Sequence, residues 1–253
     1  MPWLDMVFLG TGNAFNTDGR GCQCVWLAPR GLSPLVVDLG PTALAAMGRF
    51  GVDPASLDQV FFTHFHGDHT AGWPFLLLHA AFVARRTRPL VVFGAPGLRG
   101  QMEALTLGCF PELLTPEKLA FPIEYREVPV ARKDAIRASD GVSFDVLPLE
   151  HHATSLGLRI RVNGLTVGIS GDTGWCPALE ELAQGCDALI VECSSVEKQA
   201  YSHVSLEEIR EHAPHLGARR VFLVHITDEV FRALRDRPIP GVQACHDGMR
   251  AAL

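Results

Sequence analysis

Short apolar runs alternate with segments of helical periodicity along the chain. Runs rich in β-branched and other apolar residues, bounded by turn-forming residues, predict strands. They cover residues 4–9, 24–28, 35–39, 59–63, 90–93, 123–128, 143–149, 156–162, 165–170, 188–192 and 221–224. Apolar positions three and four residues apart predict helices over residues 42–50, 71–85, 98–107, 177–184, 205–213 and 228–236. Because strands dominate the first part and alternate with helices later, we expect an α/β (α+β) protein with two sheets sandwiched between helices.

Short sequence motifs predict a helix start, a hairpin turn and a loop. Ser205 and Glu208 have the spacing of a capping box, which predicts a helix start. Asn163-Gly164 stands between two predicted strands and predicts a hairpin turn. Residues 115–127 are irregular and contain Pro, so they are the best candidate for a loop or lid. No repeat or linker interrupts the chain, and we expect a single domain over residues 1–253.

Composition and charge narrow the classes of function. Hydrophobic residues make up 47% of the chain and charged residues 20%, which excludes a disordered or fibrous protein. The formal charge of -6 is not that of a general nucleic-acid binder. It leaves a phosphate-bearing substrate open, because bound cations can reverse the sign of the local field.

We see no targeting or membrane signal in the sequence. The N-terminal segment carries Asp5 and no basic region, and the longest apolar stretch, residues 73–84, is far shorter than the roughly 20 residues of a membrane span. We therefore expect a cytoplasmic protein without a membrane partner. The seven Cys are expected to be reduced and mostly buried. Cys22 and Cys24 are expected to pack in the core rather than bind metal, because further ligands are missing nearby.

The strongest chemical signal is the segment His64-Phe65-His66-Gly67-Asp68-His69, between a predicted strand and a predicted helix. Alternate residues leaving a strand point the same way, so His64 and His66 can face one ion. Asp68 and His69 enter the helix and point elsewhere, so the same loop can serve a second ion. Imidazole and carboxylate ligands suit zinc, and also iron or manganese.

Three further candidate ligands each follow a predicted apolar strand: His151, Asp172 and His225. Strand ends at one sheet edge converge in space, and sites in α/β proteins form there. The pattern therefore predicts that these residues meet the loop of residues 64–69.

The segment His64-x-His66-x-Asp68-His69 resembles the defining motif of the metallo-β-lactamase superfamily. The segments of His151, Asp172 and His225 follow in the order of its ribonuclease Z-like branch, and Leu9-Gly10-Thr11-Gly12 resembles the first turn of that branch. The resemblance implies a four-layer αβ/βα sandwich with two divalent metal ions, zinc by default and manganese or iron as alternatives. One ion would be held by His64, His66, His151 and Asp172, and the other by Asp68, His69, Asp172 and His225.

The resemblance implies a binuclear hydrolase with a metal-bridging hydroxide as its nucleophile. Asp68 would also orient the water, and His203 would face the scissile phosphate as a proton donor. The first hypothesis for the substrate is a phosphodiester, either a small cyclic nucleotide or a short RNA. The alternatives are a hydrolase of a thioester, sulfate ester or lactone, and a non-catalytic metal-binding relative. Members of this branch are often dimers, so a homodimer is a further expectation.

Two departures from the branch argue against transfer RNA as the substrate. We align Glu192 with a His of the ribonuclease Z motif, and we recognise no substrate-clamping arm. Arg85-Arg86-x-Arg88 is a short basic cluster that could meet phosphate, but its position is more typical of a solvated helix end.

Overall fold

The computed structural model describes residues 3–16, 18–199 and 203–253, and in this part of the chain two seven-stranded sheets form the centre. The first sheet has the strand order β14-β1-β2-β3-β4-β5-β6. Its strands are β1 (Leu4–Gly10), β2 (Cys24–Pro29), β3 (Leu35–Val37), β4 (Gln59–Phe61), β5 (Leu90–Gly94), β6 (Ile123–Glu127) and β14 (Met249–Ala252). The second sheet has the order β13-β12-β11-β10-β9-β8-β7. Its strands are β7 (Lys133–Ser139), β8 (Val142–Pro148), β9 (Leu156–Val162), β10 (Leu165–Ile169), β11 (Ala188–Glu192), β12 (Val221–Val224) and β13 (Val242–Ala244).

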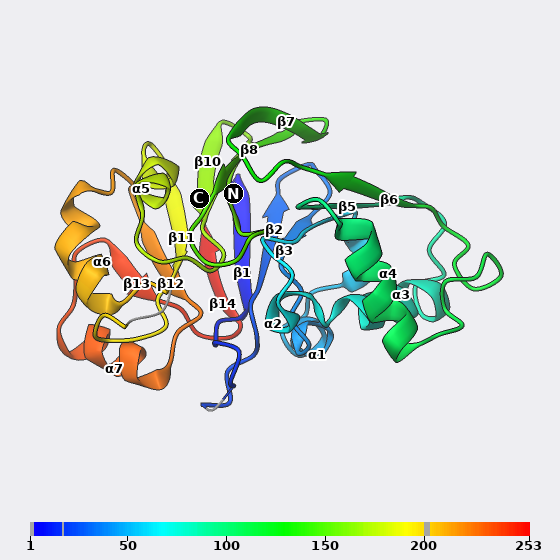
Figure 1. The fold of residues 1–253 in the computed structure, drawn as a ribbon, viewed down its shortest axis with the longest axis horizontal. Helices are drawn as coiled ribbons and strands as arrows, with labels where there is room; N and C mark the ends of the chain where they lie inside the picture. Colours follow the sequence, from blue (N-terminus) through cyan, green and yellow to red (C-terminus); the bar gives the residue numbers. More distant parts are fainter. Residues whose placement is uncertain (1–2, 17, 200–202) are drawn as a thin grey trace.

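Helices cover the outer face of each sheet, and they lie at opposite sides of the molecule in Figure 1. The first sheet carries α1 (Ala43–Arg49), α2 (Gly67–Thr70), α3 (Trp73–Phe82) and α4 (Leu98–Cys109). The second carries α5 (Pro177–Ala183), α6 (Leu206–His212) and α7 (Asp228–Asp236). Short 3₁₀ turns occupy Pro54–Ser56 and Ala213–His215. The result is the expected four-layer αβ/βα sandwich.

Three apolar clusters hold the layers together. The central cluster lies between the sheets and includes Phe61 and Phe144, whose rings meet edge to face at 5.4 Å. The second packs the outer face of the first sheet against α1, α3 and α4, around the fully buried Trp73. The third packs the second sheet against α5, α6 and α7, around residues such as Leu189. Both the inner and the outer face of each sheet are buried, which explains why the sequences of many strands are continuously apolar.

Every predicted strand and helix is found, with small shifts at the ends, but β7, β13 and β14 were missed. β7 is an edge strand whose residues are largely exposed, so it has no apolar run to reveal it. β13 is also an edge strand, and β14 has two buried and two exposed residues. Short edge strands with polar faces carry little hydrophobic signal.

The parallel strands bring their carboxyl ends to one edge of each sheet. β3, β4 and β5 are parallel neighbours in the first sheet, and β10, β11 and β12 are parallel neighbours in the second. The loops after β4, β8, β10 and β12 carry the candidate ligands, so this edge of the sandwich is where the site is built. Across the described residues, we find no helix with the length and apolar character needed to traverse a bilayer.

Candidate metal centre

The loop after β4 gives the first set of candidate ligands. His66 has extended backbone at φ -65° and ψ 151°, directly before α2, so the chain turns from strand to helix within this loop. The imidazole rings of His64 and His66 are 4.6 Å apart, and those of His64 and His69 are 4.1 Å apart. One short segment therefore directs three imidazoles and the Asp68 carboxylate toward the same edge.

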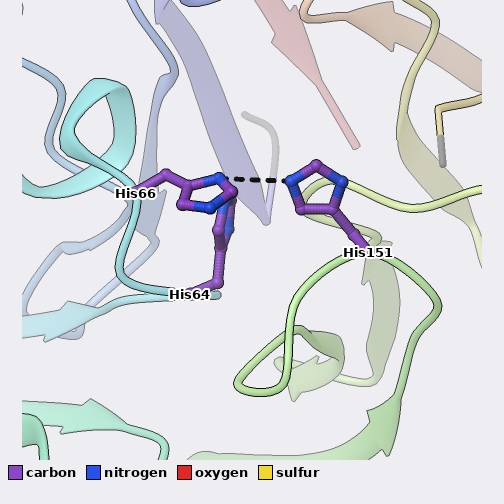
Figure 2. Close-up of side chains that lie close together, drawn as sticks. All are labelled: His64, His66 and His151. Atoms are coloured by element: carbon purple, nitrogen blue, oxygen red, sulfur yellow. Dashed lines mark hydrogen bonds between the residues drawn. The ribbon is translucent and has the colours of Figure 1, made fainter. Parts of the chain in front are cut away.

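His64, His66 and His151 form the first cluster, and the nitrogens they offer all lie within 4.8 Å of one another. Figure 2 shows the three rings pointing toward a common point from two different loops. His151 Nε2 lies 3.2 Å from His66 Nδ1. Asp172 Oδ2 is 3.9 Å from both His64 Nε2 and His151 Nε2, so its carboxylate adjoins this cluster.

Asp68, His69, Asp172 and His225 form the second cluster, again with ligand atoms within 4.8 Å. His69 Nε2 lies 3.3 Å from an oxygen of Asp68 and 3.3 Å from Asp172 Oδ1. His225 Nε2 lies 3.3 Å from Asp68 Oδ2 and 3.3 Å from Asp172 Oδ2. Asp172 thus stands between the two clusters and can contribute to both.

The buried atoms of these clusters fit divalent cations. His64 Nε2, His69 Nε2 and Asp172 Oδ1 are buried and have no hydrogen-bond partner. A buried polar atom without a partner costs about 1–3 kcal/mol, and several that converge on one point call for a bound group. Imidazole nitrogens and carboxylate oxygens are ligands that zinc, manganese and iron accept.

Neighbouring side chains hold two of the imidazoles with Nε2 toward the centre. Asp38 Oδ2 lies 2.8 Å from His69 Nδ1, and Thr63 Oγ1 lies 3.1 Å from His64 Nδ1. Asp38 also accepts hydrogen bonds from the amide and hydroxyl of Thr63, which ties the two supports together. Such outer contacts fix the ring orientation of metal-binding His. The role of Asp38 was not predicted, although this residue lies within a predicted strand of the same kind as those that precede the other ligands.

Three residues at the site have backbone conformations in the left-handed region. Asp38 and His225 are not glycines, yet they have φ of 60° and 54°, in the left-handed region that few L-residues adopt. Gly171, directly before Asp172, has φ of 60°, and a Cβ atom there would lie 2.6 Å from Thr63 Cβ. The absence of a side chain at Gly171 lets the Asp172 loop approach the loop after β4.

Two groups of the site, His64 and Asp68, have the protonation states that bind cations. Burial lowers the pKa of His64 to about 2, so this imidazole is neutral and can offer a lone pair. Burial opposes the ionisation of Asp68, but the close contacts of this carboxyl with His225 and His69 hold its pKa below the ordinary value. Neutral imidazole and ionised carboxylate are the forms that bind metal.

A cleft of about 640 Å³ opens over the two clusters, within the size range of small-molecule sites. His203 lines this cleft.

The His203 imidazole is held by a buried carboxylate. Its Nδ1 lies 2.7 Å from Glu192 Oε1. The His203 ring lies 4.6 Å from the His151 ring and stacks at 5.5 Å on the His225 ring. Glu192 is buried, and its Oε1 also accepts the Thr173 amide at 2.7 Å. His203 was expected at the site, but the contact with Glu192 was not predicted. Tyr201 and Ser202, in the same segment, lie outside the described residues.

Residues 115–127 are not a lid over this cleft. β6 occupies the end of the segment, and the loop before it borders a separate hollow that is lined by Phe82 of α3 and by Pro111 and Lys118. The described wall beside the clusters is instead formed by Asn13, Ala14 and Phe15. Sequence pattern identifies an irregular segment but does not show which end of the sandwich it covers.

Arg86 and Arg88 of the basic cluster at residues 85–88 make structural contacts. Arg86 is buried, its Nη2 lies 2.7 Å from Asp58 Oδ1, and its guanidinium lies over the Phe121 ring. Arg88 also pairs with Asp58. Arg86 is therefore neither a phosphate site nor part of a solvated helix end. Cys22 and Cys24 are buried, as expected, and belong to none of the candidate metal clusters of the described residues.

Comparison with known proteins identifies the class. Human tRNase Z, short form, superposes with a TM-score of 0.80 and 21% identity, covering 98% of both chains. The metallo-beta-lactamase fold protein YhfI from Bacillus subtilis has a TM-score of 0.80 and 20% identity, covering 99% of both chains. These matches show a shared fold. A curated ribonuclease Z that is 32% identical, together with the two ligand clusters, places the chain among the metal-dependent hydrolases of the metallo-β-lactamase superfamily, in its ribonuclease Z-like branch.

The sequence comparisons make the assignment more specific. Ribonuclease Z from Mycobacterium bovis (strain BCG / Pasteur 1173P2) is 32% identical over 202 residues, which cover 74% of this chain and 69% of that protein. The model of the family described as anti-Pycsar protein Apyc1 matches residues 4–237. The chain belongs to this Apyc1 family.

Proposed function

We propose that the chain is a phosphodiesterase that uses two divalent cations, zinc by default and manganese or iron as alternatives. The position of Asp172 carries this proposal, because its two oxygens lie within 3.9 Å of nitrogens from both clusters. His64, His66 and His151 would complete one site, and Asp68, His69 and His225 the other. When bound, such a pair lowers the pKa of a shared water toward ~7 and stabilises charge on the attacking and leaving oxygens.

The protein's own groups would orient the reactants and move the protons. Asp68 lines the cleft and is held ionised by His225 and His69, so its carboxylate can orient the attacking water. His203 holds Nδ1 against Glu192, which turns Nε2 away from that carboxylate. The pKa of the buried Glu192 is raised, so its carboxyl can give a proton to Nδ1 as Nε2 passes its own proton to the leaving oxygen of a phosphate that lies over the two clusters.

A small phosphodiester is the substrate that we favour. The cleft volume of about 640 Å³ suits a nucleotide-sized ligand. The net charge of -6 gives no long-range attraction for a large polyanion. The names of the relatives, ribonuclease Z and tRNase Z, favour RNA as a second candidate, and we retain a short RNA phosphodiester for that reason. A thioester, sulfate ester or lactone would require the same metal-bound nucleophile and remains the alternative class.

A substrate panel tests the proposal. Purified protein loaded with zinc or manganese is assayed on bis-p-nitrophenyl phosphate, 3′,5′-cyclic nucleotides, a short RNA, a transfer-RNA precursor and a set of thioesters. We expect turnover of the small phosphodiesters. Activity on thioesters alone would reject the phosphodiesterase assignment, and cleavage of the transfer-RNA precursor alone would reject the small substrate.

We also propose that the chain forms a homodimer, as the resemblance to the branch implies. Its support here is that several apolar side chains of α3, its C-terminal end and α4 are left exposed: Phe75, Phe82, Val83 and Leu107. Exposed apolar side chains of this size are a feature of interaction surfaces. Light scattering after size-exclusion chromatography measures the mass in solution, and we expect twice the 27.5 kDa of one chain. The mass of a single chain at micromolar concentration would contradict the homodimer.

A further inference from the structure

His225 differs from the other buried imidazoles of the two clusters in the surroundings of its Nδ1. Its Nε2 faces carboxylates of the second cluster at 3.3 Å. Its Nδ1 is buried and has no hydrogen-bond partner among the described residues. By contrast, Thr63 Oγ1 lies against His64 Nδ1. In the same way, Asp38 Oδ2 lies against His69 Nδ1.

A metal-bound imidazole needs an acceptor at its other nitrogen. When Nε2 of a His holds a cation, the neutral ring carries its proton on Nδ1 and becomes a donor there. A buried donor without an acceptor costs about 1–3 kcal/mol. Metal-binding His almost always donates this proton to a carboxylate, a backbone carbonyl or water. An acceptor for His225 Nδ1 is therefore expected nearby.

Glu192 has an unused oxygen in the same group of side chains. One oxygen of Glu192 and one nitrogen of each of His203 and His225 all lie within 4.8 Å of one another. Glu192 Oε1 is occupied, because the Thr173 amide and His203 Nδ1 both lie 2.7 Å from it. Glu192 Oε2 is buried and has no hydrogen-bond partner among the described residues. A buried acceptor therefore lies close to the buried donor.

The backbone brings the two residues to neighbouring strand ends. β11 and β12 are parallel neighbours, and Glu192 is in register with Val224, the residue before His225. The Cys193 amide donates to the Val224 carbonyl at 2.9 Å. His225 has φ of 54°, a conformation that few L-residues adopt and that the surrounding structure must hold. The placement of the His225 ring thus depends on contacts at this end of β12.

We propose that Glu192 is a positioning residue for the metal ligand His225, with Oε2 accepting the Nδ1 proton when Nε2 holds the second cation. The inference rests on the proposed pair of cations and adds the group that orients one of their ligands. It does not depend on the charge of Glu192, because Oε2 can accept whether or not Oε1 carries a proton. A single carboxyl would then align both the proton donor His203 and an imidazole of the metal centre.

Glu192→Gln distinguishes the two oxygens. The Thr173 amide requires an acceptor, so the Gln oxygen takes the place of Oε1 and the NH₂ group takes the place of Oε2. The NH₂ group would then meet the Nδ1 proton of His225, donor against donor. Stepwise zinc binding is measured by competition with a chromophoric chelator. We expect one step to weaken by roughly 10- to 100-fold and the other to stay unchanged.

Two further variants serve as controls. His203→Ala leaves Glu192 Oε2 in place and should bind both ions as the wild type does. Asp145→Asn makes the same acid-to-amide change at a buried carboxyl of the second sheet that belongs to neither cluster, so it should also leave both steps unchanged. In Glu192→Gln, weakening of neither step, or of both steps equally, would overturn this role and leave the two-cation proposal standing. A wild-type protein that binds no zinc would contradict both.

A measurement on the wild type does not depend on the folding of any variant. In the zinc-loaded protein, proton NMR detects the Nδ1 protons of the metal-bound imidazoles, and a hydrogen bond to a carboxyl moves such a proton downfield. The Nδ1 proton of His225 should resonate downfield together with that of His69, which Asp38 holds. An upfield position, as for a ring proton without an acceptor, would contradict the contact with Glu192.

Discussion

His203 and Glu192 show how single residues combine at the site. The Glu192 carboxylate is buried at the end of β11, and burial raises its pKa well above its ordinary value. Burial also lowers the pKa of His203. Their 2.7 Å contact fixes the orientation of an imidazole that lies beside His151 and His225. We therefore treat His203 as the group that meets the substrate and Glu192 as a positioning residue.

His203→Ala should lower kcat for a phosphodiester by roughly 100- to 10,000-fold, the usual contribution of a positioned proton donor. The bound metal should stay at the wild-type amount, because His203 is not in our ligand set. Glu192→Gln should lower kcat less, and the double variant should lose little more than His203→Ala, since both changes disable one unit. Metal analysis accompanies the kinetics, and a loss of one ion in His203→Ala would reassign this residue as a ligand.

At the scale of elements, α6 begins immediately after the His203 segment and is held by its capping box. The Ser205 hydroxyl accepts the Glu208 amide at 3.2 Å, and the Glu208 carboxylate accepts the Ser205 amide at 3.1 Å. Both residues are buried, so water cannot replace these bonds. The cap ties the start of α6 to the strand end that carries Glu192, through the Leu206 amide and the Ser195 carbonyl at 2.8 Å.

Ser205→Ala should lower the free energy of unfolding by about 1 kcal/mol, because it leaves a buried amide at the helix start without its partner. Ser205→Thr keeps the hydroxyl and serves as the matched control. Urea unfolding followed by circular dichroism measures both. Equal stability of Ser205→Ala and the wild type would show that the cap does not hold α6.

The pairing of β8 with β9 contains an ion pair between the buried Asp145 and Arg161, whose side chain is 44% exposed. Arg161 donates two hydrogen bonds to Asp145, at 2.7 and 2.5 Å, and the Ala135 amide donates a third at 2.8 Å. Burial opposes the ionisation of Asp145, but these donors hold its pKa below the ordinary value. A carboxyl with a lowered folded-state pKa stabilises the fold above its unfolded pKa, and this stability is lost as pH falls through the folded value.

Asp145→Asn should therefore be less stable than the wild type at pH 7, and the difference should narrow as pH falls below about 4. Urea midpoints at a series of pH values measure this. Asp140→Asn is the control, since the Asp140 side chain is 89% exposed and should give no such pH dependence. A difference that stays constant down to pH 3 would mean that the charge of Asp145 does not contribute.

At the scale of the whole molecule, the site is assembled from segments far apart in the sequence. Residues 64–69 come from the first sheet, whereas His151, Asp172 and His225 follow strands of the second. The sequence predicted this meeting because each residue follows an apolar strand and because the loop motif has a distinctive spacing. The two-sheet sandwich was predictable for a similar reason, since most strands are buried on both faces.

The supports of the site were harder to predict than the residues that face its centre. Asp38 and Glu192 each lie in a predicted strand, but nothing in their neighbourhood shows which imidazole they will meet. The role of residues 13–15 depends on anchors near residues 228 and 247, which no local pattern reveals. Residues 115–122 form an irregular loop, as expected, but this loop does not line the cleft. The edge strands were missed because their exposed residues carry no hydrophobic signal.

We propose that imidazoles and carboxylates from both sheets together hold a pair of divalent cations. The most direct measurement is the metal content of the purified protein by mass spectrometry, together with turnover before and after chelation. We predict about two equivalents per chain, loss of activity on chelation and recovery with zinc or manganese. Metal content near zero, with no turnover of any ester after either metal is added, would contradict the account.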